Sequence, residues 1–206
     1  MTRIAIGKGR GAEDAFRMLA QGGINVPETF RRGRRLVVTP QGGETTLVLA
    51  RQRDLPQLLL SGHVDVAIGS SVWFLEAGNA DLCCLHEFIN GRCRLSLIAS
   101  AKTFTSAAPR VCTRFVNLAR RFVPEADVME LHGCNEIALP LGAADYVVDV
   151  VETGRTLEEM ELEEVKVLTE IGYGLWSTRR LAQHCDRLLD SASQDGGDPN
   201  SYLVSE

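Results

Sequence analysis

Residues 145–156 carry the side chains of this sequence that are best suited to chemistry. A hydrophobic run, Tyr146–Val151, is interrupted by one carboxylate, Asp149, and is followed by a short polar loop around Gly154. A glycine at this point lets the backbone turn tightly, so that successive N–H groups can point at a single anion. The start of a following helix would favour negative charge further. The donors that would surround such an anion are Thr153, Gly154, Arg155 and Thr156.

Two carboxylates, Asp149 and Glu152, sharpen this interpretation, because a negative charge beside an anion site is unfavourable unless it has its own role. They can accept hydrogen bonds from two neighbouring sugar hydroxyls, or they can hold Mg²⁺. A ribose 5-phosphate would satisfy both halves of the segment. A Walker A loop is excluded, because its G-K-[ST] ending and its spacing are missing. The alternative left open is an ordinary strand-to-helix turn whose threonines cap the helix.

The segments around this loop alternate between two kinds of pattern. Short β-rich runs, several of them apolar on consecutive residues, alternate with amphipathic helical patterns. This alternation predicts an α/β fold with mostly parallel strands. The expected strands are 3–6, 35–39, 45–49, 64–68, 94–99, 127–131 and 146–151. The expected helices are 13–21, 55–60 with Asp54 as its N-cap, 113–122 and 178–189.

Composition argues against several classes of protein. The net charge is -5 and aromatic residues make up 6%, whereas a nucleic-acid-binding surface usually shows a basic face with interleaved aromatic residues. The arginines at 31, 32, 34 and 35 cluster around Gly33, which indicates a solvated hairpin tip or a site for an anionic ligand or partner. The six cysteines form no C-x-x-C pair. No secretion signal and no membrane-spanning run are found, so we expect a soluble cytoplasmic protein without nucleic-acid or membrane partners.

Motifs along nearly the whole chain resemble those of ATP phosphoribosyltransferase, the first enzyme of histidine biosynthesis. The segment VVDVVETGRTLEE resembles the segment of that family that binds 5-phosphoribosyl pyrophosphate (PRPP), and Lys8-Gly9-Arg10 resembles its K-G-R. The motifs keep the family's order and spacing. The further matches are Arg51 with Asp54-Leu55-Pro56, Gly62-His63-Val64-Asp65, Gly91-Arg92-Cys93-Arg94-Leu95, Arg110-Val111-x-Thr113 with Asn117, and Gly133, Glu136, Ala138, Gly142 and Asp145.

The resemblance implies a two-lobed α/β fold similar to the type II periplasmic binding proteins, with the active site in the interlobe cleft. We expect residues 1–90 and 165–190 to form the first lobe. Residues 91–164, including the PRPP-binding loop, would form the second lobe. Residues 191–206 have the composition of a flexible tail.

The resemblance also assigns roles to individual residues. The cations Lys8, Arg10 and Arg94 would face pyrophosphate or the triphosphate of ATP, although Arg94 could equally be a surface charge at a strand edge and Lys8 an ordinary turn lysine. Mg²⁺ would enter with PRPP close to the carboxylates. The residues implied for PRPP are Asp149, Glu152, Thr153, Gly154, Arg155 and Thr156, with Asp149 and Glu152 near the ribose and the metal. The residues implied for the acceptor are Asp65, Ser70, Ser71 and Glu136.

The sequence ends without the C-terminal regulatory domain of the long family members, so it resembles the short form. Short forms generally work with a separate regulatory subunit that resembles histidyl-tRNA synthetase. We therefore expect such a subunit, a homo-oligomer, or both.

Several positions depart from the family pattern. Ser70 and Val72 stand where a glycine and a polar residue are usual, Cys134-Asn135 replaces Ser-Val, and Gly174 stands where a basic residue is expected. Those near Val72 concern the nucleotide acceptor rather than PRPP. Three functions therefore stay open: ATP phosphoribosyltransferase, a paralogue that transfers phosphoribose to another heterocycle, and a non-catalytic ligand-binding or regulatory module.

Overall fold

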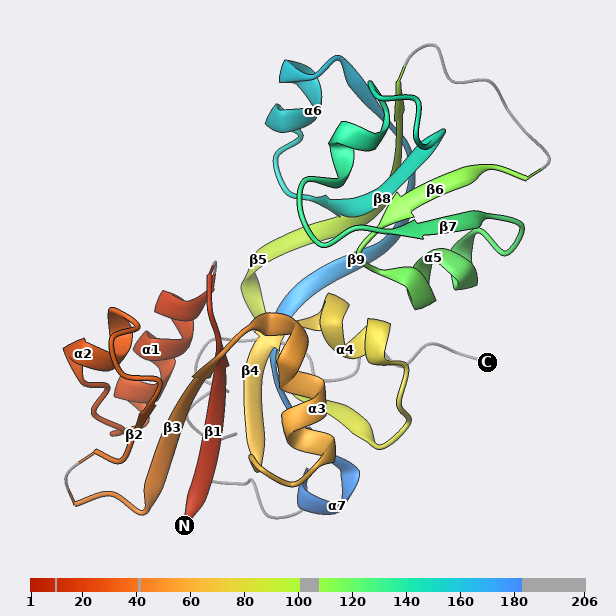
Figure 1. Cartoon of the computed structure of the whole chain (residues 1–206). Coiled ribbons are helices and arrows are strands. Elements are labelled where there is room, and N and C mark those ends of the chain that lie inside the picture. Colours follow the sequence, from red (N-terminus) through yellow and green to blue (C-terminus); the bar gives the residue numbers. More distant parts are fainter. Residues whose placement is uncertain (10, 41, 101–107, 183–206) are drawn as a thin grey trace. The chain divides into compact units, whose positions relative to one another are not determined.

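The computed structural model describes residues 1–9, 11–40, 42–100 and 108–182, with the side chains of 89–91 left outside this description. The described residues form two compact units (Figure 1): unit 1 comprises Met1–Gly91 with the segment from Gly172 to Ala182, and unit 2 comprises Arg92–Ile171. The chain therefore returns from unit 2 to unit 1 after Ile171, whereas the sequence analysis placed this boundary after residue 164. The expected tail, 191–206, lies outside the described residues.

Unit 1 is built on a sheet whose three central strands are parallel. Its strand order is β2-β3-β1-β4-β9. β1 (Thr2–Gly7) pairs in parallel with both β3 (Thr45–Ala50) and β4 (Val66–Ser70). β2 (Val37–Val38) and β9 (Leu162–Thr178) add antiparallel strands at β3 and β4. The carboxyl ends of the three parallel strands thus meet at one edge, where open α/β sheets bind ligands.

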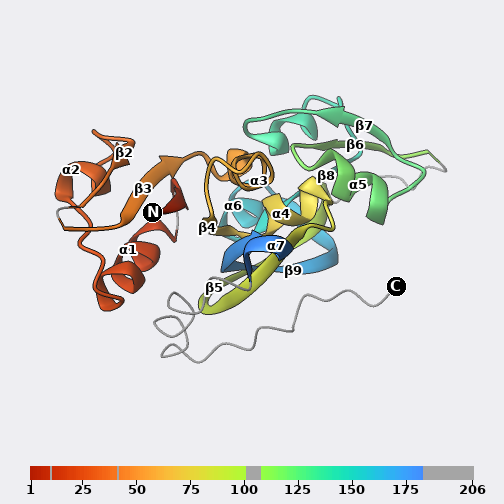
Figure 2. The same ribbon diagram turned by 90° about the horizontal axis from the view of Figure 1, so that it is seen from below.

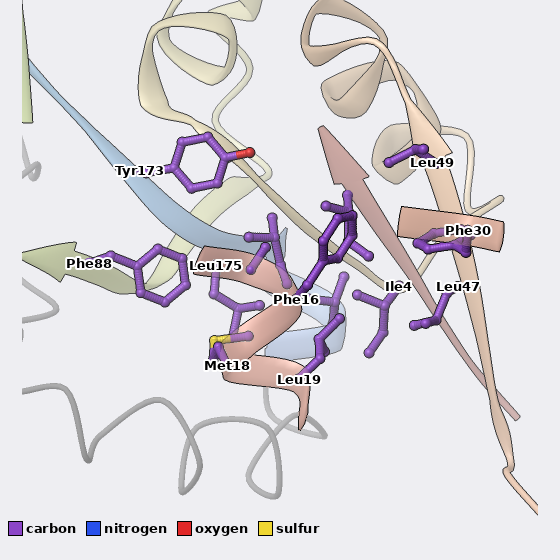
Figure 3. Close-up of a cluster of buried hydrophobic side chains, with 14 residues drawn as sticks. Ile4, Phe16, Met18, Leu19, Phe30, Leu47, Leu49, Phe88, Tyr173 and Leu175 are labelled. Atoms are coloured by element: carbon purple, nitrogen blue, oxygen red, sulfur yellow. The ribbon is translucent and has the colours of Figure 1, made fainter. Parts of the chain in front are cut away.

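Helices cover both faces of this sheet. α1 (Ala12–Gln21) and α2 (Glu28–Arg31) pack on one face, and α1 lies beside β1 and β3 (Figure 2). α3 (Leu55–Leu60) and α4 (Ser71–Ala77) pack on the other face. Successive strand residues alternate between the two cores because side chains alternate across a strand. The first core contains Ile4, Phe16, Leu19, Phe30, Leu47, Ile68 and Leu175 (Figure 3), and the second contains Ala5, Leu55, Leu59, Ala67, Phe74 and Trp176.

The nine-stranded sheet of the described residues continues beyond β9 with the order β5-β8-β6-β7, and these strands are mixed in direction. β8 is parallel to β6 and antiparallel to β5, and β6 is parallel to β7. β5 and β9 each contribute residues to both units. The elements of unit 2 and the last helix of unit 1 are β5 (Leu82–Ser100), β6 (Arg110–Thr113), α5 (Val116–Phe122), β7 (Asp127–Glu130), η2 (Asn135–Ala138), β8 (Tyr146–Val151), α6 (Arg155–Glu159) and α7 (Arg179–Ala182). In the described part of the chain, no helix is long and apolar enough to cross a membrane.

Some element boundaries differ from the sequence prediction. Asp54 precedes α3 as expected, but its side chain makes no capping hydrogen bond. α5 begins later than predicted because Thr113 ends β6, where its hydroxyl accepts the N–H of Phe115 at 2.9 Å. Thr178 is the last residue of β9 rather than the first of a helix. Of the predicted helix 178–189, residues 183–189 lie outside the described residues.

The arginine cluster does not form a hairpin tip. Arg31 belongs to α2 and forms an ion pair with Glu13, while Arg32 forms an ion pair with Glu28. The chain then turns through Gly33, whose φ is 68°. A short helix and its exit turn therefore replace the predicted hairpin, because the glycine lies at the end of a helix rather than between two strands.

Candidate active site

The loop between β8 and α6 is built around a left-handed glycine. Gly154 has a φ of 79°, and its carbonyl accepts the N–H of Leu157 at 2.9 Å, which begins α6. A Cβ added at Gly154 would meet nothing within 4 Å, so glycine is required for the backbone conformation rather than for space. The Oγ1 of Thr153 lies 3.4 Å from the N–H of Arg155 across the turn.

The polar side chains of this turn face the solvent. Thr153, Arg155 and Thr156 are exposed, whereas Leu157 is buried in the core of unit 2 and anchors α6. The Nε of Arg155 lies 3.1 Å from the carboxylate of Glu159, and the arginine side chain remains 82% exposed. The turn therefore presents hydroxyls and a cation next to backbone N–H groups, which is a combination suited to a phosphate.

Asp149 lies on β8 shortly before the turn, and three donors hold its carboxylate. Its Oδ2 accepts from Arg114 Nη2 at 3.1 Å and from Asn135 Nδ2 at 2.7 Å, and its Oδ1 accepts the N–H of Val150 at 2.7 Å. Asp149 is 7% exposed. Glu152 is exposed at the surface. The two carboxylates predicted to act together thus differ in burial, because Asp149 is buried and Glu152 is exposed.

The described residues do not offer a site for a resident metal ion. Within residues 1–9, 11–40, 42–100 and 108–182, no group of three or more histidine, cysteine, aspartate or glutamate side chains could hold one. Asp149 already accepts three hydrogen bonds and forms an ion pair with Arg114. A carboxylate has about four acceptor positions, so little of its capacity is left for a cation. Direct coordination of Mg²⁺ by Asp149 therefore does not fit this geometry.

Arg94 on β5 forms a two-pronged ion pair with Glu164 on β9. Its Nε and Nη2 lie 2.5 and 2.6 Å from the two carboxylate oxygens, and its Nη1 lies 3.4 Å from the carbonyl oxygen of Glu152. Ser96 donates to the same carboxylate at 2.5 Å. The hydrogen bonds between the two side chains raise the pKa of Arg94 and lower the pKa of Glu164. Arg94 thus connects β9 with the start of the turn after β8, and its charge is balanced.

The remaining predicted cations follow β1 in unit 1. Lys8 is exposed, and its backbone N–H donates to the carbonyl of Ala50 at the end of β3 at 2.8 Å. The next residue, Gly9, has a φ of 102°. Arg10 lies outside the described residues. Lys8 therefore lies at the carboxyl edge of the parallel strands, where ligands bind in open α/β sheets.

A half-buried amide joins several strands at this edge. Gln52 accepts the N–H of Ser70 at 3.0 Å and donates to the hydroxyl of Tyr173 at 2.9 Å, and that hydroxyl donates to the carbonyl of Gly7 at 3.3 Å. Sequence reasoning missed Gln52 and Tyr173. The signal in the sequence was Gly7, since a glycine at a strand end often marks the close approach of another group. In the structure that group is Gln52, whose side chain would lie 2.4 Å from a Cβ at position 7. This network fixes the strand end that carries Lys8.

The structure does not bring the predicted acceptor residues of unit 1 together. Ser70 and Ser71 lie at the carboxyl end of β4, where the Oγ of Ser71 accepts the N–H of Gly172 at 3.0 Å. Asp65 precedes the opposite end of β4 and accepts the backbone N–H of Arg3 at 2.7 Å. Asp65 therefore joins the amino ends of two strands, away from the edge that carries Ser70.

Comparisons with known proteins identify the family. Residues 51–194 match the family model described as HisG: ATP phosphoribosyltransferase. The chain belongs to the ATP phosphoribosyltransferase family. It is 33% identical over 174 residues to the ATP phosphoribosyltransferase of Chromohalobacter salexigens, covering 82% of this chain and 80% of that one. It is 33% identical over 181 residues to the enzyme of Variovorax paradoxus, covering 83% and 85%.

Solved structures show the same fold. The ATP phosphoribosyltransferase (HisG:HisZ) complex from Thermotoga maritima contains a chain that matches with a TM-score of 0.80 at 22% identity, covering 95% of this chain and 100% of that chain. Tv2483 bound to L-arginine matches with a TM-score of 0.58 at 10% identity, covering 94% and 84%. The aliphatic sulphonate binding protein SsuA from Escherichia coli, a periplasmic protein, matches with a TM-score of 0.56 at 13% identity, covering 94% and 72%. These likenesses confirm the predicted α/β fold of the type II periplasmic-binding-protein class.

Within this ATP phosphoribosyltransferase fold, two departures in unit 1 have structural reasons. Val72 is 2% exposed, so it packs inside the unit instead of presenting a side chain to a ligand. Gly174 pairs with Gly69 across β4 and β9, and a Cβ at Gly174 would lie 2.9 Å from the carbonyl oxygen of His86. A basic side chain at position 174 would therefore require the neighbouring backbone to move.

The departures in unit 2 lie beside the phosphoribosyl segment. Cys134 is exposed, and Asn135 is fully buried with its amide on the carboxylate of Asp149. Glu136, the acceptor candidate of this unit, is half-buried in η2 next to Asn135. Sequence reasoning noted Asn135 only as a departure, because nothing local connects it with a strand residue 14 positions away.

Proposed function

We propose that this chain transfers the 5-phosphoribosyl group of PRPP to N1 of ATP and releases pyrophosphate, the reaction that opens histidine biosynthesis. Membership of the ATP phosphoribosyltransferase family supports this function. The observation that carries the donor half is the exposed turn Thr153–Thr156, which directly follows the strand that carries Asp149. Its left-handed glycine, hydroxyls and arginine form the surface that a 5-phosphate requires.

The proposed chemistry breaks the bond between the anomeric carbon and pyrophosphate and forms a bond from that carbon to N1 of the base, with inversion. Positive charge develops on the ribose ring in the transition state, so anchoring the ring and holding the nucleophile in line supply much of the catalysis. Thr153, Gly154, Arg155 and Thr156 would bind the 5-phosphate. Asp149 and Glu152 would accept hydrogen bonds from the ribose hydroxyls.

The cations would act on the phosphates in different ways. Lys8 and Arg10 would face the leaving pyrophosphate or the triphosphate of the acceptor. Arg94 would act indirectly, because Glu164 balances its charge and its third nitrogen faces the backbone of Glu152. Mg²⁺ would arrive with PRPP and neutralise charge on the leaving group.

One observation favours a second candidate function. Val72 is apolar and buried where the family resemblance leads one to expect a polar side chain in the acceptor region. A PRPP-dependent transferase with the same donor site but another heterocyclic acceptor would tolerate this change. In that case Ser70, whose side chain is partly exposed at the end of β4, would be the first polar group to examine.

The partner proposal follows from a structural relative. The matching chain from Thermotoga maritima belongs to a HisG:HisZ complex. We infer that this chain works in the cytoplasm with a comparable regulatory subunit that resembles histidyl-tRNA synthetase, or as a homo-oligomer. The subunit should therefore be included in any test of activity.

The test is product formation with the purified chain, PRPP, Mg²⁺ and ATP, with and without a HisZ-like subunit. Pyrophosphate release is followed together with the mass of the nucleotide. A mass gain equal to one phosphoribosyl group on ATP supports the proposal. Pyrophosphate release with another heterocycle, but not with ATP, would replace it with the second candidate. Absence of release with every acceptor and with the subunit present would refute both.

A further inference from the structure

Asn135 and Arg114 hold the carboxylate of Asp149 in an arrangement that does not favour the stability of the fold. Asn135 is 0% exposed, and its amide nitrogen donates to Oδ2 at 2.7 Å. The amide oxygen cannot replace that nitrogen, because two oxygens would then repel each other across the contact. Asn135 Oδ1 is consequently directed away from Asp149, and within the described residues it is buried with no hydrogen-bond partner.

Arg114, the second side chain that donates to this carboxylate, likewise has one buried polar atom without a partner in the described part of the chain. Arg114 places Nη2 3.1 Å from Oδ2 and also donates from Nη2 to the carbonyl of Gly133 at 2.7 Å. Its Nε is buried without a hydrogen-bond partner in the described part of the chain. Unpartnered buried polar atoms disfavour folding, and an apolar side chain in place of Asn135 would avoid one of them. The arrangement therefore gains geometric control of the carboxylate at the expense of stability.

The three donors leave Asp149 with one defined acceptor position. Oδ2 receives Arg114 and Asn135, and Oδ1 receives the N–H of Val150. Each carboxylate oxygen has two acceptor positions, so one position on Oδ1 remains. The side chain of Asp149 is still 10% exposed and lies on the strand that leads into the phosphate-binding turn.

We propose that Asn135 and Arg114 are positioning residues that fix Asp149 so that its remaining acceptor position receives one hydroxyl of the phosphoribosyl group. The inference rests on the proposed function, because it assumes that the ligand is a ribose 5-phosphate. It adds that discrimination between ribose and deoxyribose depends on a residue that never touches the sugar. Asn135, one of the departures from the family pattern, thereby becomes a determinant of sugar specificity.

The experiment measures binding rather than turnover, by calorimetric titration with ribose 5-phosphate, 2-deoxyribose 5-phosphate and 3-deoxyribose 5-phosphate. The unaltered chain should bind ribose 5-phosphate about tenfold more tightly than one of the deoxy compounds, as expected for a hydrogen bond to a charged group. In Asn135→Ala the ratio should fall to about twofold, while affinity for that deoxy compound stays unchanged. The control is Glu125→Gln, an exposed change in the same unit that should keep the full ratio.

Arg114→Lys gives a second, independent test, because it keeps the positive charge but loses the planar geometry of the guanidinium. The side chain of Arg114 is 30% exposed, so this variant should fold even where Asn135→Ala does not. The ratio of its affinities for ribose 5-phosphate and the deoxy compound should also fall, to less than half of the ratio measured for the unaltered chain. If a variant binds both compounds more weakly by the same factor, the ratio of affinities is unchanged. That result would overturn the inference, because it is expected of a residue with a structural role only. An unaltered chain that binds ribose 5-phosphate without preferring it would also overturn the inference, and one that binds none of the compounds would overturn the proposed function as well.

Discussion

Replacing Tyr173 by phenylalanine removes one hydroxyl from the carboxyl edge of unit 1. That hydroxyl accepts from Gln52 at 2.9 Å and donates to the carbonyl of Gly7 at 3.3 Å, and Tyr173 is 8% exposed, so water has little access to either partner. Each net hydrogen bond contributes about 1 kcal/mol, so we expect the free energy of unfolding to fall by about 2 kcal/mol. For a chain of this size that corresponds to a melting temperature about 4–8 °C lower. Because Gly7 precedes Lys8, the KM for the phosphate-bearing substrates should rise as well.

The same substitution should change how stability depends on alkaline pH. Burial raises the pKa of Tyr173 to about 12. An unfolded tyrosine has a pKa of about 10, so this contribution to stability is fully present below about pH 10 and is lost as the pH rises toward 12. The unfolding free energy of the unaltered chain should exceed that of Tyr173→Phe by an amount that shrinks by about 1.4 kcal/mol for each pH unit between about 10 and 12. Cys84, whose pKa is also raised to about 12 by burial, is present in both proteins and cancels.

Urea unfolding of both proteins at pH 8 and at pH 11 provides the assay. A difference in unfolding free energy that stays constant or grows between the two pH values would refute the account of a buried, neutral hydroxyl. Equal stability at pH 8 would show that the two hydrogen bonds contribute nothing. Trp176 lies in the second core of unit 1 and offers a fluorescence signal for the transition.

Three further predictions concern unit 2. Thr156→Val, an exposed change of nearly equal shape, should weaken PRPP binding about tenfold in calorimetry without lowering the melting temperature; unchanged affinity would remove Thr156 from the site. Gly154→Ala forces an L-residue into φ 79° and should cost about 1 kcal/mol of unfolding free energy while weakening PRPP binding, whereas unchanged binding would mean that the turn can deform freely. Arg110 lowers the pKa of Asp145, chiefly through their side-chain hydrogen bond, so stability that is present above about pH 4 is lost on further acidification. Asp145→Asn should show a flatter loss in acid unfolding, and an identical acid profile would contradict this.

The strand β8 and the turn that follows it could be predicted from sequence because their signals are local. The apolar run Tyr146–Val151 is bounded by polar residues, and the structure gives β8 those same limits. Gly154 marks the turn because few other residues adopt a left-handed conformation easily. The family likewise followed from motifs whose order and spacing are independent of the structure.

The strand β9 was missed although its sequence contains a signal. Val165 and Val167 alternate with Glu164 and Lys166, which is the two-residue period of a strand, but the valines are 54% and 48% exposed rather than buried. Charged residues at every second position concealed the pattern. The first part of β9 is mostly exposed and therefore looks like a polar connection, whereas its later part, from Ile171 to Ser177, is buried.

The side-chain networks could not be predicted, because they join residues that are distant in sequence. Asn135 and Arg114 meet Asp149 across 14 and 35 positions, and Gln52 meets Tyr173 across 121. No local pattern specifies such pairs, since they depend on the order of strands in the sheet. The ion pair of Arg94 could not be predicted for the same reason, because its partner on β9 lies 70 positions away.

We propose above all that the turn after β8 binds the 5-phosphate of PRPP. The most direct measurement is a titration of the ¹⁵N-labelled chain with PRPP, followed by the backbone amide resonances in NMR spectra, with ribose 5-phosphate as the comparison ligand. We expect the N–H signals of Gly154, Arg155 and Thr156 to shift most, and both ligands to shift them in the same direction. Signals of this turn that stay in place while PRPP shifts another segment would contradict the account.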